Sequence, residues 1–183
     1  MSVQKKFGGE LTDEEFRKFT LYTTQSNNLT DDNTRATLLG FFNTKVRIAP
    51  GAIVRINDNQ IGCNSYIGLY SYINGDVQIG ENVLIGPHAS IVASNHVYSP
   101  QDKCFSGRSD LSTGKVIIEN GVWLASSVVI TPGVTIGKCS LICSNSLVTS
   151  NIPSHSIAAG TPAKIIGRID QQTGNYIWFN KEK

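Results

Sequence analysis

The sequence predicts an all-β fold, a parallel β-solenoid in which short strands wind into stacked coils. Two observations carry this prediction: an aliphatic anchor recurs at every sixth position, and a small residue follows each anchor at a fixed offset. A period of six excludes a run of amphipathic helices. Twelve anchored hexads are too regular for chance, and their anchors are Ile61, Ile67, Ile73, Ile79, Ile85 and Ile91, then Ile118, Leu124, Ile130, Ile136, Ile142 and Val148.

The small residues define the inside of each coil. Four positions after its anchor, a hexad carries Ser, Ala or Val, and only Asn95 and Ile152 depart from this rule. Alternate side chains of a strand face opposite sides, so the small residue and the next anchor both point inward. Three strands close a triangular coil, and the hexads supply about four coils that must stack to bury their apolar side. Glycine follows five anchors, where we expect tight corners: Gly62, Gly68, Gly80, Gly86 and Gly137.

The N-terminal flank carries helical signals over residues 11–42. Thr12 or Asp13 can cap one helix ahead of two glutamates, and a second helix can start at Asp31 or Asp32. We expect these helices to cover the open end of the solenoid.

The remaining flanks set the expected boundaries. Arg55 falls on an anchor position, so the segment before Ile61 predicts an imperfect first coil at best. The expected organisation is a helical cap over residues 1–45, then a β-helix over residues 46–153 with a loop insertion at 97–117. A C-terminal tail over residues 154–183 follows, and its pattern assigns neither strand nor helix.

Composition limits the function classes. The 183 residues suffice for one domain, and 16 Lys+Arg against 14 Asp+Glu give a formal net charge of +2, too balanced for a typical nucleic-acid-binding protein. No apolar run approaches the ~20 residues that span a bilayer, and the polar start resembles no signal peptide, so we expect a cytoplasmic protein. The four cysteines form no CxxC pair, which argues against a zinc site or a disulfide framework.

Three segments carry a family resemblance: GPHASIVASNH at 86–96, VWLASSVVITPGVTIG at 122–137 and AAGTPAKIIGRI at 158–169. Together with RATLLGFFNT at 35–44, they resemble the hexapeptide-repeat acyltransferases, and within them the maltose and galactoside O-acetyltransferases and relatives from surface-polysaccharide gene clusters. The resemblance implies a left-handed β-helix and acetyl-CoA as the acetyl donor. It also implies a homotrimer with active sites between neighbouring subunits.

His96 is the predicted catalytic base. It is the last residue of its hexad, so its side chain should leave the solenoid wall, and it stands immediately before the insertion. Acetyl transfer from a thioester needs a base for the acceptor, and a neutral imidazole can accept a proton at once. The γ-class carbonic anhydrases share this solenoid but bind zinc through three histidines. Only His88 and His96 are expected to lie close together, so we predict no metal site.

The resemblance also suggests where acetyl-CoA binds. The backbone N–H near Ser126 is the expected oxyanion donor. In relatives the cofactor arm runs between coils, which corresponds to the backbone near Ser144 and Thr149 of this chain. Lys164 and Arg168 are cations that could meet the phosphates.

The acceptor side departs from the sugar enzymes. Asn74 stands where they often have an aspartate, and Tyr66 where they often have an asparagine. Both can still bind sugar hydroxyls, and Arg108 and Asp110 in the insertion could contribute. The leading interpretation is an O-acetyltransferase acting on a sugar or sugar nucleotide in surface-polysaccharide biosynthesis. The alternatives are an N-acetyltransferase of an amino sugar or small amine, and, less favoured, a non-catalytic scaffold or a γ-class carbonic anhydrase.

Overall fold

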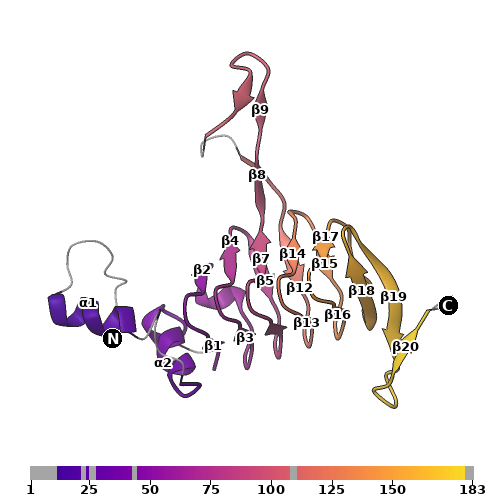
Figure 1. The fold of residues 1–183 in the computed structure, drawn as a ribbon, viewed down its shortest axis with the longest axis horizontal. Coiled ribbons are helices and arrows are strands. Elements are labelled where there is room, and N and C mark those ends of the chain that lie inside the picture. Colours follow the sequence, from indigo (N-terminus) through magenta and orange to yellow (C-terminus); the bar gives the residue numbers. More distant parts are fainter. Residues whose placement is uncertain (1–11, 22–23, 25–27, 43–44, 108–110, 180–183) are drawn as a thin grey trace.

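The protein is a parallel β-solenoid with two short helices at its N-terminal end and an antiparallel hairpin at its C-terminal end (Figure 1). The computed structural model describes residues 12–21, 24, 28–42, 45–107 and 111–179. Successive coils stack along the long axis of the molecule, so the chain advances from one end to the other (Figure 1). No helix among these residues is long and apolar enough to cross a membrane.

Three stacked sheets, here called faces A, B and C, form the walls of the solenoid. Within each face the strands of successive coils pair in parallel. Face A contains β1 (Arg47–Ile48), β3 (Tyr66–Ile67), β6 (Leu84–Ile85), β13 (Trp123–Leu124), β16 (Leu141–Ile142) and β18 (Ser156–Gly160). Face B contains β2 (Ile53–Arg55), β4 (Tyr72–Asn74), β7 (Ser90–Val92), β14 (Val129–Ile130) and β17 (Leu147–Val148). Face C contains β5 (Val77–Ile79), β12 (Val116–Ile118) and β15 (Thr135–Ile136).

The solenoid is longer than the hexads alone predict. Face A stacks six parallel strands, from β1 to β18, instead of about four. The first coil is present and imperfect, as expected, because a 3₁₀ turn at Asp58–Gln60 (η2) adds one residue before Ile61. Val54, not Arg55, therefore takes the anchor position and pairs with the anchor Ile73.

The core follows the repeat. All twelve anchors are buried, as are the ten small residues that precede the strands, which confirms the predicted inward positions. Buried serines satisfy their hydroxyls within the stack: Ser65 donates to the carbonyl of Gly80 at 2.9 Å and accepts from the N–H of Val83 at 3.0 Å. Such serines tie one coil to the next, because a buried hydroxyl without a partner would be costly.

The corner glycines have a different role from the one the sequence suggested. None of the five has a positive φ; instead the residue three places after an anchor is left-handed, as at Asn64 (φ 61°) and Ser127 (φ 59°). A Cβ on Gly68 would lie 2.5 Å from the carbonyl carbon of Gly86, one coil along. Glycine is required there because the backbones of successive coils approach so closely.

Two helices precede the solenoid, α1 (Asp13–Thr20) and α2 (Asp31–Leu38). Thr12 caps α1 in a reciprocal capping box with Glu15, but no residue of α1 is buried. Only α2 packs on β1, through Arg35, whose buried guanidinium donates to Asp32 at 2.6 Å and to the carbonyl of Ile48. The expectation that both helices cover the end of the solenoid therefore holds for α2 alone.

A long hairpin projects from the corner between faces B and C (Figure 1). Its strands are β8 (Ser94–His96), β9 (Tyr98–Ser99), β10 (Cys104–Phe105) and β11 (Leu111–Thr113), with β8 paired to β11 and β9 to β10, both antiparallel. The hairpin includes His96 itself, and the chain has rejoined the solenoid at Val116, which pairs with Val77.

The C-terminal tail forms strands. After β18, β19 (Ala163–Ile169) turns back antiparallel to it, and β20 (Tyr176–Trp178) pairs with β19. This hairpin extends face A and covers the last coil. The six-residue repeat does not predict it, because the tail does not continue the repeat.

The close approach of coils makes a stability prediction. Gly68→Ala places a methyl group against the backbone of the next coil, and overpacking of this kind costs about 1–3 kcal/mol. We expect a lower midpoint of thermal unfolding by circular dichroism. Gly107→Ala is the matched control, since an added Cβ there meets nothing within 4 Å. Equal midpoints for the two variants would contradict the account of the corner glycines.

Candidate active site

His96 stands at the foot of the projecting hairpin with one ring nitrogen fixed. Its Nδ1 lies 2.8 Å from the carbonyl oxygen of Ser106 on the returning strand. The hydroxyl of Ser106 in turn accepts from the N–H of Val97 at 3.2 Å, so the same residue holds the backbone beside the histidine. A carbonyl oxygen only accepts, so Nδ1 carries the proton in this contact. In the neutral ring, Nε2 then has a free lone pair on an exposed side chain.

The other histidines stand apart from His96. His88 lies at the corner between faces A and B, where its ring stacks on Tyr70 with 5.6 Å between centroids. His155 follows the last face C segment and donates its backbone N–H to Lys138. In the described part of the chain, no three His, Cys, Asp or Glu side chains are grouped as metal ligands would be.

Ser126 and Ser144 lie together at the corner between faces A and B. The two corners stack directly, because the N–H of Asn145 donates to the carbonyl of Ser126 at 3.0 Å. Ser127 continues the row by donating to Pro87 at 2.8 Å. Among the described residues the N–H of Ser126 itself has no acceptor, so it is available to a ligand. A free backbone donor at this corner is what an oxyanion site requires.

The two candidate phosphate-binding cations lie at opposite ends of β19. Lys164 pairs with Ala159, at the end of β18 beside the Ser144 corner. Arg168 pairs with Ser156, four residues and roughly 13 Å along the strand. It lines a separate hollow with His155 and Asp170. Hydrogen bonds from Thr173 are the main cause that lowers the pKa of Asp170, and the Arg168 charge adds to it.

The remaining cofactor candidate, Thr149, follows β17 at the corner between faces B and C. This is the corner from which the hairpin with His96 projects, and it is a full strand away from Ser144. The structure therefore brings Ser126, Ser144 and Lys164 together, places Thr149 on the side of His96, and separates Arg168 from both groups.

The candidate residues for binding the acceptor also lie in two separate places. Asn74 ends β4 and pairs with Val92, just below the hairpin that carries His96. Tyr66 lies on face A instead, under the guanidinium of Arg47 at 5.3 Å from the ring centroid. Burial raises the pKa of Tyr66, and the nearby Asp32 charge raises it further. Arg108 and Asp110 lie outside the described residues.

An apolar ladder runs along the outside of face A. Leu84, Trp123 and Leu141 stand in register on successive coils, and Val129 and Leu147 do so on face B. Leu84 and Trp123 are each 44% exposed, whereas Leu141 is only 6% exposed next to β18. Part of the expected outward stripe is therefore covered within the chain itself.

The predicted base, His96, and the predicted cofactor corner at Ser126 and Ser144 are far apart within one chain. Ser90 and Val129 lie side by side on face B. Ser126 comes three residues before Val129, whereas His96 comes six residues after Ser90, so the two residues lie on opposite sides of this pair. At strand spacing this separation is roughly 20–30 Å. One copy of the chain does not assemble the predicted site.

Sequence reasoning missed the Ser106 carbonyl, which fixes the His96 ring. A backbone acceptor has no side-chain signature, and only the fold of the hairpin, in which the N–H of Ser106 donates to the carbonyl of Val97 at 2.7 Å, brings it to the histidine.

Comparison with known proteins supports the resemblance. The family model described as bacterial transferase hexapeptide (six repeats) matches residues 60–93. The chain is 36% identical over 123 residues to the galactoside O-acetyltransferase of Escherichia coli (strain K12), an alignment that covers 63% of this chain and 59% of that protein.

Two solved structures that are 26% and 30% identical in sequence to this chain share its fold. A maltose O-acetyltransferase from Clostridium difficile 630 matches with a TM-score of 0.60 at 26% identity and covers 86% of both chains. The polySia specific acetyltransferase NeuO matches with a TM-score of 0.52 at 30% identity, covering 75% of this chain and 65% of that one. The chain spans 59% and 51% of the length of two galactoside O-acetyltransferases. These findings confirm the resemblance to the hexapeptide-repeat acyltransferases.

Proposed function

We propose that this protein is an acetyl-CoA-dependent O-acetyltransferase that acts on a sugar hydroxyl. The observation that carries the proposal is the hydrogen bond from His96 Nδ1 to Ser106, which leaves Nε2 as an acceptor. A sugar hydroxyl has a very high pKa and must lose its proton as it attacks, so it depends on such a base.

The residues divide the chemistry among them. Acetyl-CoA supplies the thioester. His96 Nε2 takes the proton of the acceptor hydroxyl as its oxygen attacks the thioester carbon, and later returns that proton to the leaving thiolate. The N–H of Ser126 donates to the oxyanion of the intermediate, and Lys164 pairs with a phosphate of the cofactor. Asn74, beside the hairpin, offers an amide to a second sugar hydroxyl.

We further propose that the active site forms between two copies in a homotrimer. The separation of His96 from Ser126 supports this, because the corner between faces B and C of one copy can face the corner between faces A and B of the next. Thr149 then joins Ser144 across the same boundary. The half-exposed Leu84 and Trp123 offer apolar area for such contacts.

The names of the relatives support the acceptor class. The galactoside and maltose enzymes are O-acetyltransferases of sugars, and NeuO is a polySia specific acetyltransferase. We further propose a sugar or sugar nucleotide as acceptor and a place in surface-polysaccharide biosynthesis in the cytoplasm; a 30% identical relative from Escherichia coli (strain K12), a putative lipopolysaccharide biosynthesis O-acetyl transferase, supports the pathway.

Removing the base should strongly reduce turnover without unfolding the protein. We expect His96→Ala to lower kcat by about 10²–10⁴-fold, since general-base catalysis commonly contributes that much. The side chain is exposed, so thermal stability should change little. A thiol-release assay with acetyl-CoA and a sugar panel measures the loss. His155→Ala, on another corner, is the control; near-wild-type turnover by His96→Ala would end the assignment.

The oligomeric state tests the shared site. Light scattering at micromolar concentration should return about three times the 19.8 kDa of one chain. Trp123→Lys places a charge in the exposed ladder and should shift the mass toward the single chain, with loss of activity. A wild-type protein that is both monomeric and active would contradict an intersubunit site.

The product identifies the acceptor atom. Mild alkali cleaves an O-acetyl ester and leaves an N-acetyl amide intact. We expect the labelled acetyl group on the preferred acceptor to be released by alkali. An alkali-stable product would overturn the hydroxyl assignment in favour of an N-acetyltransferase of an amino sugar or small amine.

A further inference from the structure

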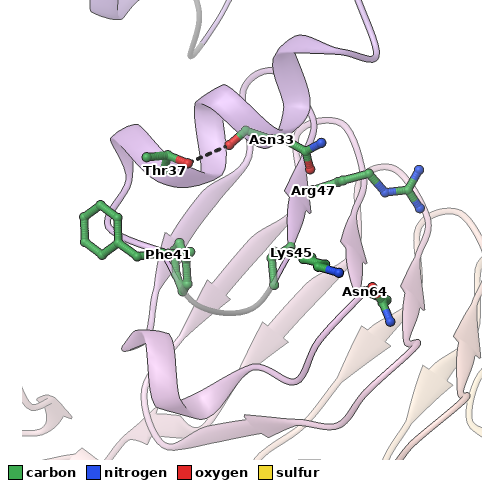
Figure 2. A pocket seen from close by; sticks show the side chains of 8 residues that line it. Asn33, Thr37, Phe41, Lys45, Arg47 and Asn64 are labelled. Carbon is green, nitrogen blue, oxygen red and sulfur yellow. Dashed lines mark hydrogen bonds between the residues drawn. The ribbon is translucent and has the colours of Figure 1, made fainter.

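A hollow of about 450 Å³ lies between α2 and the first two coils, away from the hairpin with His96. Figure 2 shows the charged ends of Lys45 and Arg47 and the amide of Asn64 directed to the same side of it. Its volume falls within the range of small-molecule sites. The lining residues are Asn33, Thr37, Phe41, Phe42, Lys45, Val46, Arg47 and Asn64.

The hollow holds two positive charges that no described carboxylate pairs with. The ion pairs of the described residues involve other cations, and the buried carboxylate of Asp32 on α2 is already bound to Arg35 at 2.6 Å. Arg47 stacks its guanidinium over the ring of Tyr66 at 5.3 Å. Stacking occupies the flat face of a guanidinium and leaves its N–H edge free for two parallel hydrogen bonds to an oxyanion.

Neutral groups around the cations suit a sugar ring. Thr37 donates its hydroxyl proton to the carbonyl of Asn33 at 3.1 Å, so its oxygen remains an acceptor for a ligand hydroxyl (Figure 2). The amide of Asn64 contacts Asn82 only weakly, at 3.4 Å, and can turn to a ligand. Phe42 is 49% exposed and supplies an apolar surface of the kind that packs against the carbon face of a sugar.

We propose that this hollow binds a sugar that carries a carboxylate or phosphate group. Lys45 and Arg47 hold the oxyanion, Asn64 and Thr37 bind ring hydroxyls, and Phe42 contacts the ring. Asn64 belongs to the corner between faces C and A, whereas the hairpin leaves from the corner between faces B and C, so this site is separate from the proposed acetyl-transfer site. The proposal goes beyond that function and does not depend on it.

Calorimetric titration without acetyl-CoA tests the proposal. The probes are glucose 6-phosphate and glucuronic acid, with glucose and inorganic phosphate as comparisons, at low salt. We expect both acidic sugars to bind at least about tenfold more tightly than glucose and than inorganic phosphate, since charge-assisted hydrogen bonds and ring contacts both contribute. Equal affinity for glucose would overturn the role of the cations. Equal affinity for inorganic phosphate would overturn the recognition of a sugar.

Charge-removing variants locate the binding. The double variant Lys45→Gln/Arg47→Gln should lower the affinity for both acidic sugars by about tenfold or more while keeping the wild-type thermal midpoint, because both side chains are exposed. Arg55→Gln is the matched control: Arg55 also stacks over a tyrosine, Tyr72 at 5.7 Å, but on face B outside the hollow. Unchanged affinity in the double variant, or an equal loss in Arg55→Gln, would place the binding elsewhere.

Discussion

The close stacking of coil on coil is the constraint on which the rest of the structure depends. Each strand donates backbone hydrogen bonds to the equivalent strand of a neighbouring coil, so equivalent residues form straight rows along the axis. Parallel strands lie about 4.8 Å apart, and at some corners the residue after an anchor comes so near the next coil that an added Cβ would lie 2.5 Å from its backbone. Gly62 and Gly68 meet this limit, and the left-handed residues at the corners turn the chain within it.

The rows also decide where chemistry can occur. Because corners of one kind stack over each other, the backbone around Ser126 and Ser144 forms a continuous edge with a free N–H donor. The hairpin with His96 leaves the solenoid at the opposite end of face B. The repeat is too rigid to bring these two edges together within one chain. A second copy placed beside the first is the simplest arrangement that joins them, and the exposed residues Leu84 and Trp123 offer surface for that contact.

The sequence predicts the repeat well and the exceptions poorly. Anchors such as Ile67 and Ile142 are buried as expected, since burial of alternate residues follows directly from the period. The anchor of the first coil was misplaced at Arg55 because one added residue in a 3₁₀ turn shifts the count without a clear signal. Lys164 and Arg168 are only four residues apart in the sequence, so the motif suggests that they act together. In the structure they lie at opposite ends of the extended strand β19, which separates them.

The central claim, that the base and the cofactor corner come from different copies, is tested most directly by mixing two inactive variants. His96→Ala lacks the base, and Ser144→Tyr fills the exposed cofactor corner. Co-assembled in equal amounts, they form some sites with an intact His96 from one copy and an intact corner from the other. Random assembly predicts recovery of about a quarter of the wild-type activity, because each contributor is intact in half of the sites. Mixed trimers without any recovered activity would contradict the shared site.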